Sequence, residues 1–589
     1  MRPRPARGRR ALLWAPAAAV AVLLGIGLLL PPKALVLRQP EWRPAGTTWR
    51  GAIHVHTNRS DGTGTIDEVA KAASRAGLDF VVLTDHGDGT RPPEPPAYRS
   101  GVLVLDGVEI GTSAGHYLAI GMTRAPYPLG GDARDVVEDV ARLAGFGVIA
   151  HPDSAKDGQG WQHWDLPADG IEWLNTDSQW RDEGGLRLAR AVLTYPFRPA
   201  ETLASQLNQG QLLARWDRAA SSRPLVALAG ADAHARIGLS GGGDPYEGRP
   251  FLAVPSYEAS FRAFSLQLVT PGPRSGRAEE DARAVLASLR AGRLHTVIDG
   301  WATPAIFEFS ARGGGIEVAE GGEVRAADPM VMHVRSNAPL YAAVVLLRDG
   351  VEVHRVDRQS MVYATDRPGR YRVEIWLGRP GKRSPIPWLV SNAITLRKTS
   401  AVAGSVPGGA EVDGRAVIPE EGQAGGETWA IAPRWHVEHD PRSTGELIPA
   451  TERPGESSMR FRLGPGTPAG QFAALVTPVR LDAGARAIVF SGQALEPMRV
   501  SVQLRAPSGL EGERWRRSVY LDNNPREVRV ALDEMTPAGP TRTHTVSLPL
   551  ADNLLFVVDT VNTAPGTAGE FTVSGLRVEG ESTDRPASQ

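Results

Sequence analysis

The sequence predicts a multidomain protein, in which an N-terminal transmembrane helix is followed by an α/β domain and then by two all-β sandwich domains. Three observations lead to this prediction. The chain has 589 residues, which is longer than a single hydrophobic core usually serves. Up to about residue 300, short apolar runs alternate with helical patterns, which indicates βα units and a parallel sheet or barrel. Beyond residue 300, apolar and polar residues alternate as they do in antiparallel strands.

The N-terminus has the pattern of a membrane anchor. Residues 1–10, MRPRPARGRR, contain five arginines, and residues 11–30 are uncharged. About 20 apolar residues suffice to cross the hydrocarbon core of a bilayer, and basic flanks stay in the cytoplasm. We therefore expect a basic cytoplasmic tail (1–10), a transmembrane signal-anchor (11–30) and a tether (31–46). The protein would be a single-pass protein of the cell membrane, with the part of the chain that follows the anchor extracytoplasmic.

Secretion after signal cleavage is the alternative to this anchor. A signal peptide ends in a small-residue cleavage site. Here the apolar run ends in Pro31-Pro32-Lys33, and no Ala-x-Ala motif follows. The sequence therefore favours an anchor that is not cleaved.

The amino-acid composition limits the kinds of metal site that the protein can form. The chain contains no cysteine, which excludes disulfides, iron–sulfur clusters and thiolate zinc sites. Any bound metal must therefore be held by His, Asp and Glu. The formal net charge is -1, which gives no support to a long nucleic-acid track.

Residues 47–300 contain the expected βα units. Helices are predicted for TIDEVAKAASRAG (65–77), which ends in a glycine stop, and for DARDVVEDVARLAG (132–145). The apolar runs read as strands, and each ends in polar residues: GLDFVVLTDH (77–86), VLVLDGVEIG (102–111), FGVIAHPD (146–153), GIEWLNTD (170–177) and PLVALAGADAH (224–234).

The rest of the chain reads as β structure. Residues 301–398 are expected to form a β-sandwich with turns at Asp349-Gly350 and Pro368-Gly369. A Gly-rich linker (399–427) precedes a second, jelly-roll-like sandwich (428–582). The final residues, STDRPASQ, are expected to be disordered.

Metal-capable side chains follow the apolar runs. In GAIHVHTNRSDG (51–62), alternate residues of a strand would project His54 and His56 together, which suits a metal ion. A half-buried strand with polar residues on its solvent face is the alternative for that stretch alone. The complete set is His54, His56, Asp61, His86, Glu109, His116, His151, Asp232 and His234. Sites of α/β folds lie at the C-terminal ends of strands, so we expect these residues to converge.

The motif series HxH…SDG, TDH, GVE, AHP and GADAH resembles the PHP (polymerase and histidinol phosphatase) family over residues 49–300. The resemblance implies a distorted (β/α)7, TIM-like barrel over 47–300. It also implies two or three divalent metal ions (Mn, Zn or Fe) and hydrolysis of phosphoesters.

The resemblance also implies which residues hold each ion. One ion would be held by His54, His56, Glu109 and Asp232. A second would be held by Asp61, His86 and His234. Glu109 would bridge to a third, completed by His116 and His151. Asp61 stands where many family members have a histidine, and this harder ligand favours manganese or iron(II) over zinc.

The expected function is that of a metal-dependent phosphoesterase in which a metal-bound hydroxide attacks phosphorus. The chain has no cysteine and no GxSxG motif, so no protein nucleophile is expected. Candidate substrates are a small phosphomonoester, a nucleotide or the 5′ end of a short oligonucleotide, as for an exonuclease. The alternative is a membrane-anchored carbohydrate-binding or adhesion protein with a catalytically inactive metal-binding barrel.

Other residues have weaker signals. Arg59 and Arg236 are candidates for phosphate binding, although surface charge is the alternative. Asp85 and Asp153 are candidates for orienting imidazoles, or equally for capping and turns. Two groups of aromatic residues are candidates either for stacking on a ligand or for packing in the core. The first group is Trp161, Trp164, Trp173 and Trp180. The second group, which could form a glycan site, is Trp429, Trp435, Trp515 and Tyr520.

Overall fold

The computed structural model describes residues 25, 27–176, 185–208, 210–238, 251–252, 254–326, 328–379, 382–383, 386–398, 427–449, 456–467, 470–507 and 512–580. Most of the predicted transmembrane segment (11–30), nearly all of the predicted linker (399–427) and the last residues (582–589) lie outside this range. Within the described residues, no helix combines the length and apolar character needed to cross a bilayer.

The chain divides into two compact units, each described by itself. Unit 1 comprises Met1–Arg124 and Asp132–Ala401, and unit 2 comprises Ala125–Gly131 and Val402–Gln589. Unit 1 therefore holds both segments predicted as separate domains, 47–300 and 301–398, except for residues 125–131, which belong to unit 2.

In the described part of unit 1, seven strands are joined into a ring by backbone hydrogen bonds. They are β2 (Thr47–Val55), β3 (Phe80–Leu83), β5 (Val102–Thr112), β6 (Gly115–Ile120), β7 (Phe146–Ile149), β8 (Gly170–Asn175) and β9 (Val226–Gly230). Neighbouring strands are parallel except around β6, which runs antiparallel to β5 and β7. The segment after β9 returns to β2: Ala231 N donates to Ile53 O at 2.9 Å and His56 N donates to Ala233 O at 3.1 Å.

The reversed direction of β6 has a consequence for the site. β5 and β6 form a hairpin in which Gly111 lies opposite His116 and Thr112 opposite Gly115. The start of β6 therefore lies at the same end of the ring as the carboxyl ends of the parallel strands.

Five described helices lie between the ring strands in the sequence: α2 (Ile66–Ala76), α3 (Ala133–Arg142), α5 (Gly185–Thr194), α6 (Pro199–Gln206) and α7 (Leu212–Ala219). Two more follow β9: α8 (Tyr257–Ala263) and α9 (Ala278–Arg290). The predicted helix at 65–77 is confirmed: Thr65 and Glu68 form a capping box, and Gly77, at φ 75°, ends the helix in the left-handed conformation. The predicted helix at 132–145 is confirmed as α3, where the Asp132 side chain accepts a hydrogen bond from Arg134 N.

Further pairings connect the ring to the β part of unit 1. β12 (Ser265–Thr270) pairs with β2 on one side and with β13 (Leu294–Val297) on the other. β13 also pairs with β24 (Leu389–Ser391). β1 (Leu35–Val36), within the predicted tether, pairs in parallel with β14 (Ala302–Thr303). Short pairings also join β4 (Ala97–Arg99) to β5, and β10 (Ile237–Gly238) to β11 (Phe251–Leu252). The pairing of β1 with β14 thus holds the predicted tether in the fold of unit 1.

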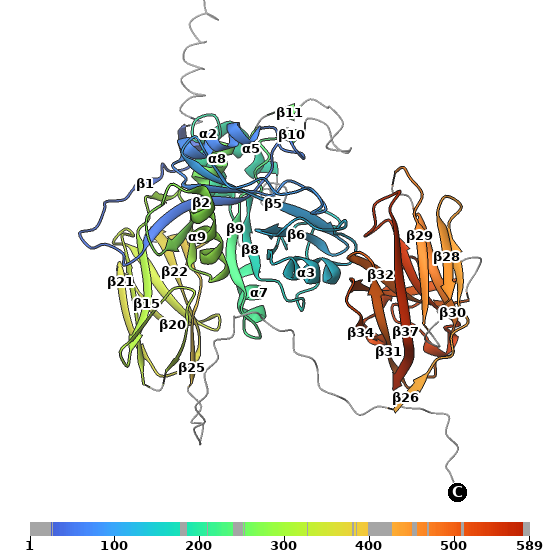
Figure 1. The fold of residues 1–589 in the computed structure, drawn as a ribbon. Coiled ribbons are helices and arrows are strands. Elements are labelled where there is room, and N and C mark those ends of the chain that lie inside the picture. The colour runs from blue at the N-terminus through green and yellow to red at the C-terminus, as the bar shows by residue number, and fades with distance from the viewer. Residues whose placement is uncertain are drawn as a thin grey trace, which may run out of the picture. The chain divides into compact units, whose positions relative to one another are not determined.

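The β part of unit 1 contains two groups of strands (Figure 1). One sheet has the order β16 (Ile316–Ala319), β15 (Phe307–Gly313), β18 (Met330–Ser336), β21 (Ser360–Thr365). The other strands belong to the sheet that continues from the ring: β17 (Glu323–Ala326), β19 (Ala342–Arg348), β20 (Val351–Val356), β22 (Gly369–Arg379), β23 (Lys382–Arg383), β24 and β25 (Ile394–Lys398). The predicted turn at Asp349-Gly350 is confirmed, and both residues have positive φ, at 51° and 80°.

The described residues of unit 2 form two sheets that share one core. The first comprises β26 (Glu427–Ala430), β28 (Thr444–Pro449), β29 (Ser457–Arg462), β31 (Ala485–Ala494), β34 (Arg526–Ala531) and β37 (Ala568–Gly580). The second comprises β27 (His436–His439), β30 (Phe472–Pro478), β32 (Met498–Ala506), β33 (Glu513–Leu521), β35 (Thr536–Pro537) and β36 (Asn553–Asp559). Two 3-10 turns, η1 (Leu532–Glu534) and η2 (Leu548–Leu550), complete it. Phe490 of the first sheet meets Phe556 of the second edge to face, with ring centroids 4.9 Å apart, as in a β-sandwich.

Candidate metal centre

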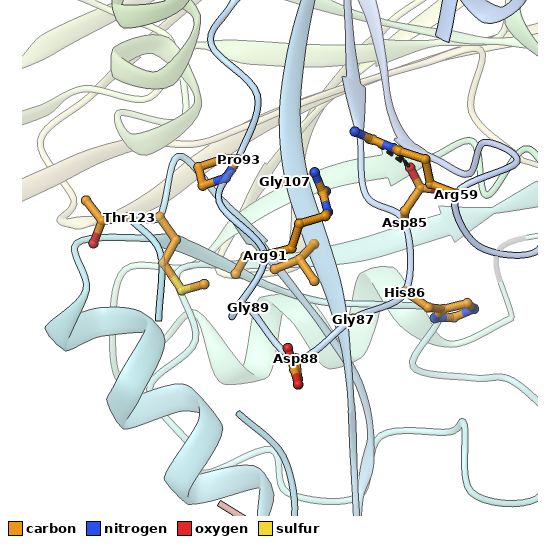
Figure 2. Close-up of a pocket in the computed structure, with 13 residues that line it drawn as sticks. Arg59, Asp85, His86, Gly87, Asp88, Gly89, Arg91, Pro93, Gly107 and Thr123 are labelled. Carbon is orange, nitrogen blue, oxygen red and sulfur yellow. Dashed lines mark hydrogen bonds and ion pairs between the residues drawn. The ribbon is translucent and has the colours of Figure 1, made fainter. Parts of the chain in front are cut away.

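A cavity of about 370 Å³ opens beside the loop that follows β3. Figure 2 shows His86 and the pair Arg59–Asp85 on one side of it, with Pro93 and Thr123 on the other. Its volume falls in the range of small-molecule sites. His86 belongs both to the lining of this cavity and to the cluster described next.

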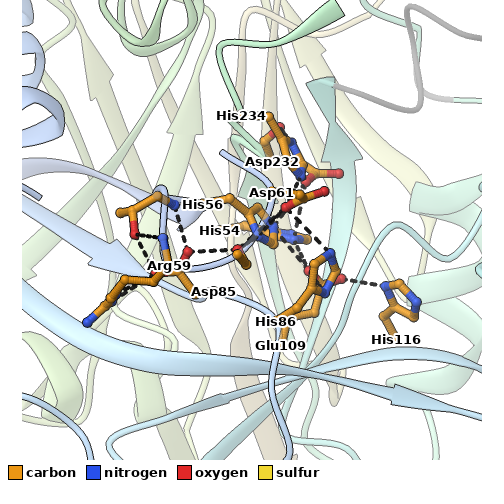
Figure 3. Close-up of polar contacts among 12 residues, drawn as sticks. His54, His56, Arg59, Asp61, Asp85, His86, Glu109, His116, Asp232 and His234 are labelled. Atoms are coloured by element: carbon orange, nitrogen blue, oxygen red, sulfur yellow. Dashed lines mark hydrogen bonds and ion pairs between the residues drawn. The ribbon is translucent and has the colours of Figure 1, made fainter. Parts of the chain in front are cut away.

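The structure brings all nine predicted residues together at one end of the ring. Figure 3 shows these side chains apart from His151. Among the described residues they form four overlapping groups, in each of which the candidate ligand atoms lie within 4.8 Å of one another. The groups are His56, Asp61, His86 and His234; His54, His56 and Asp232; His54, Glu109 and His151; and His86, Glu109 and His116. The second and third groups are fully buried, whereas the other two are partly exposed.

The topology explains why segments far apart in the sequence meet here. His54 lies near the end of β2, and the residues from 86, 151 and 232 onward follow β3, β7 and β9 directly. The carboxyl ends of parallel strands meet at one end of such a ring. Glu109 and His116 come from the β5–β6 hairpin, whose turn reaches the same end.

The backbone at three of these residues is unusual. His54, His151 and Asp232 have φ of 61°, 28° and 44°, values that non-glycine residues seldom adopt and that cost on the order of 1–3 kcal/mol each. The register between β2 and β3 also shifts between Ala52 and Val55. His54 and His56 therefore converge through an irregularity in the strand, rather than through the regular alternation that the sequence suggested.

Glu109 is the centre of the cluster, because its carboxylate contacts imidazoles on every side. Its Oε1 lies 2.7 Å from His116 Nδ1 and 3.0 Å from His151 Nε2. Its Oε2 lies 3.2 Å from His54 Nε2, 3.0 Å from His56 Nε2 and 3.3 Å from His86 Nδ1. One buried carboxylate thus links residues from all four groups.

These contacts shift the ionisation of the cluster in a consistent direction. Burial acts to raise the pKa of Glu109 and of Asp232, but the surrounding histidines lower both well below the usual range. Burial acts to lower the pKa of His54, yet Glu172, Asp232 and Glu109 together raise it well above its ordinary value. The pKa of His56 is raised to about 10, because its contacts with Asp232 and Glu109 outweigh burial. These opposite directions reflect the mutual attraction between the carboxylates and the imidazoles of the cluster.

The donor set fits divalent metal ions. Nε2 of His56 and Nδ1 of His151 are buried and make no hydrogen bond among the described atoms. His56 Nε2 nevertheless lies 3.0 Å from Glu109 Oε2 and 3.5 Å from Asp232 Oδ1. Imidazole nitrogens and carboxylate oxygens gathered in this way are the ligands of zinc, manganese and iron sites. In three respects the groups differ from those implied by the family resemblance, since His56 also joins Asp61, His86 also joins His116, and His54 also joins His151.

Glu172 is a site residue that the sequence analysis did not identify. It lies in β8, is completely buried, and its Oε1 is 2.7 Å from His54 Nδ1. Its Oε2 accepts hydrogen bonds from His151 N at 2.7 Å and from Asn175 Nδ2 at 2.9 Å. A carboxylate at Nδ1 fixes the tautomer of His54 so that Nε2 faces the cluster. Its only signal in the sequence is a charged residue within the apolar run GIEWLN.

Gly230, the last residue of β9, makes room for Glu172. A Cβ at position 230 would lie 1.8 Å from Glu172 Oε1 and 2.3 Å from its Cδ. Any side chain at this position would therefore displace the carboxylate that holds His54.

Arg59 is already engaged by carboxylates. Its guanidinium forms ion pairs with Asp85 at 2.8 Å, with Glu94 at 3.1 Å and with Asp106 at 2.7 Å. Its charge is therefore compensated within the protein, and its predicted role in phosphate binding finds no support in these contacts. Arg236 is half-buried two residues after His234, and its role stays a prediction.

Asp85 organises the loop after β2. It accepts hydrogen bonds from Thr57 N at 2.7 Å and from Ser60 Oγ at 2.7 Å, and Ser60 Oγ lies 3.3 Å from His56 Nδ1. Asp85 thus reaches the imidazole of His56 through Ser60. Asp153 instead receives a hydrogen bond from Arg215 at 2.6 Å.

The aromatic residues that we considered for ligand stacking mostly pack in the two cores. Trp161, Trp173 and Trp515 are buried. Trp429 and Trp435 pack against the core of unit 2. The ring centroid of Trp164 lies 5.6 Å from the Arg215 guanidinium, and that of Tyr520 lies 5.1 Å from the Arg526 guanidinium. Trp180 is outside the described residues.

No family model matches the chain, and no curated protein matches it. Among solved structures, the chain is similar to a two-domain protein from Bacteroides vulgatus that contains a predicted PHP-like metal-dependent phosphoesterase. The identity is 14% and the TM-score 0.28, over 62% of this chain and 99% of that one. It is also similar to a family 11 carbohydrate-binding module from Clostridium thermocellum (13% identity, TM-score 0.21, 25% of this chain and 89% of that one).

A third similar structure comes from work on carbohydrate-binding modules of the β-sandwich superfamily (14% identity, TM-score 0.18, 46% of this chain and 97% of that one). At TM-scores this low, similarity carries no argument about function. We therefore interpret the function from the metal centre itself.

Proposed function

We propose that unit 1 is a metal-dependent phosphoesterase that uses two or three divalent ions. The observation that carries this proposal is the convergence of nine imidazole and carboxylate side chains around Glu109, in groups whose ligand atoms lie within 4.8 Å. Manganese, zinc and iron are the candidate ions, and the carboxylate at Asp61 favours manganese or iron(II).

The candidate ligands differ in how far they are exposed to solvent. His54, His56 and Glu109 are buried, whereas the side chains of His86, Asp61, His116 and His234 are 29, 17, 16 and 16% exposed. The buried residues would fix the ions, and a substrate would approach across the exposed ones. Bound divalent ions supply Lewis-acid activation of water and neutralise charge on the phosphoryl group.

The chain's own residues would hold the reacting groups in place. Glu172 keeps the Nε2 of His54 aimed at the cluster, and Asp85 shapes the loop that carries Asp61 through its bonds to Thr57 and Ser60. Since Arg59 is neutralised by three carboxylates, recognition of the phosphate would fall mainly to the ions.

A small phosphomonoester or a nucleotide is the substrate class that we propose. The cavity beside His86 has a volume of about 370 Å³, which accommodates a small leaving group. The formal net charge of -1 gives no electrostatic support for a long polynucleotide. The 5′ end of a short oligonucleotide, as for an exonuclease, is the second substrate to test.

We also propose that the ring in unit 1 is a distorted (β/α)7 barrel and that residues 11–30 anchor the protein in the cell membrane. The hydrogen bonds that return from the end of β9 to β2 support the first proposal. The five arginines before an uncharged run of 20 residues support the second. The catalytic part would then be extracytoplasmic.

A screen for phosphate release tests the proposed activity. The full-length protein in detergent would be stripped with a chelator and supplied with Mn²⁺, Zn²⁺ or Fe²⁺. It would then be offered phosphomonoesters, nucleotides and 5′-phosphorylated oligonucleotides. We expect metal-dependent release that is lost in His56→Ala and kept in His163→Ala. His163 is exposed and lies outside the cluster, so it is a matched control. Equal release by both variants would refute the proposal.

The alternative, an adhesion or carbohydrate-binding protein with an inactive barrel, stays a prediction. Trp515 is a core residue, and Trp429 and Trp435 are partly buried against the core of unit 2. Of the predicted aromatic group, only Trp429, Trp435 and Tyr520 are partly exposed, so a contact with sugar would have to use these. A glycan array with the full-length protein tests this alternative separately from catalysis.

A further inference from the structure

Helix α5 presents an apolar face to solvent. Leu186 is 91% exposed, Val192 63% and Leu193 48%. At about 100° of rotation per residue, these side chains lie on the arc opposite the two residues of α5 that are buried, Ala191 and Thr194. The helix thus turns its smaller side chains toward the protein and its larger apolar ones away from it.

This face lies where the predicted membrane segment joins unit 1. Arg190 of α5 donates a hydrogen bond through Nε to Leu29 O at 2.8 Å, and Arg198 donates one to Pro31 O. Leu28 is 88% exposed. The end of the apolar run 11–30 is therefore held directly against α5 and the residues after it.

The charges of this region favour a membrane surface. In GLRLARAVLTYPFR (185–198) every charged residue is an arginine, and Phe197 adds a further apolar side chain that is 54% exposed. A helix with an apolar face and basic residues beside it is the pattern of helices that lie in the bilayer interface. The arginines can place their charge at the headgroups while their alkyl chains cover apolar surface.

We infer that α5, together with Leu28 and Phe197, docks on the lipid bilayer and inserts its apolar face into the interface of the leaflet from which unit 1 emerges. The occupant of this face is the lipid surface, because the adjoining apolar segment 11–30 brings α5 to it. Docking would restrain the orientation of unit 1 beyond what a single helix can do. This inference rests on the proposed anchor and is independent of the proposed chemistry.

The absence of cysteine makes a direct test practical, because a single introduced cysteine can be labelled uniquely. The full-length variants Leu186→Cys and Leu193→Cys would carry an environment-sensitive fluorophore. They would be reconstituted in vesicles of phosphatidylcholine and phosphatidylglycerol. Leu340→Cys is the matched control, since Leu340 is 79% exposed in the segment between β18 and β19.

We expect a blue-shifted emission at positions 186 and 193, and quenching by lipids that carry a spin label near the headgroup, with neither effect at 340. Protein that floats with the vesicles but has the same emission at all three positions would overturn the docking and leave the anchor. Protein that does not float would overturn both. A blue shift that disappears on dilution and is insensitive to spin-labelled lipid would assign the face to a second copy of the chain. Phosphate release by the same samples is measured separately, so a failure of the docking is distinguishable from a failure of the proposed chemistry.

Discussion

Replacing Glu172 by Gln is predicted to weaken metal binding without removing any candidate ligand. The carboxylate of Glu172 accepts from His54 Nδ1 at 2.7 Å through one oxygen, and from His151 N and Asn175 Nδ2 through the other. Every neighbour is a donor, so an amide group would leave the donors on one side without an acceptor. A buried donor that loses its partner costs about 1–3 kcal/mol.

The expected loss in metal affinity follows from the role of such carboxylates. Removing the partner that orients a metal-binding histidine typically lowers affinity roughly 10- to 100-fold, which corresponds to about 1.4–2.7 kcal/mol. The assay is a calorimetric titration of the chelator-treated, full-length protein with Mn²⁺. Circular dichroism would verify that the variant is folded.

A second buried pair provides the control. Glu320 lies 3.0 Å from His295 Nδ1 and also accepts a hydrogen bond from Asn392 N at 2.9 Å, outside the cluster. Glu320→Gln should therefore lower stability to a similar degree and leave the affinity for Mn²⁺ unchanged. An unchanged affinity in Glu172→Gln, or an equal loss in both variants, would refute the assigned role of Glu172.

Three further predictions concern the same centre. Gly230→Ala should reduce Mn²⁺ affinity as Glu172→Gln does, because the added Cβ would lie 1.8 Å from the Glu172 carboxylate; titration with full affinity would show that the carboxylate can move aside. Asp232→Asn should lower the bound metal measured by elemental analysis, whereas full occupancy would mean that Asp232 is not a ligand. The raised pKa of His56, about 10 against an ordinary 6.5, stabilises the metal-free fold fully below pH 6.5 and progressively less as the pH rises toward 10. The melting temperature of chelated protein should therefore fall over that interval, and fall less in His56→Ala; parallel profiles would contradict this assignment.

The sequence predicted most members of the centre because they follow apolar runs, whose direction determines which ends meet. Glu109, inside β5, and His116, at the start of β6, join them because these two strands form a hairpin. The sequence could not predict how they meet. His54 reaches the cluster through a positive φ and a shift in register, which depend on the hydrogen bonds between β2 and the segment after β9. Glu172 was missed because it lies inside a strand that is buried throughout, rather than at its end.

The interpretation of Arg59 shows a related limit. A basic residue in TNRSDG suggests a phosphate ligand, but its partners Asp85, Glu94 and Asp106 come from three later segments. Only tertiary structure brings them together. The predicted domain boundary near residue 300 has the same limit. β13, before this boundary, pairs with β24, after it, so the sheet continues across the boundary. A change in sequence pattern does not reveal such a pairing.

The most direct measurement is anomalous diffraction at the manganese edge from crystals of the protein grown with Mn²⁺. The account predicts at least two anomalous peaks among the nine side chains around Glu109, each bound by imidazole nitrogen and carboxylate oxygen. Crystals that bind manganese elsewhere, or that show no peak at this end of the ring, would contradict it.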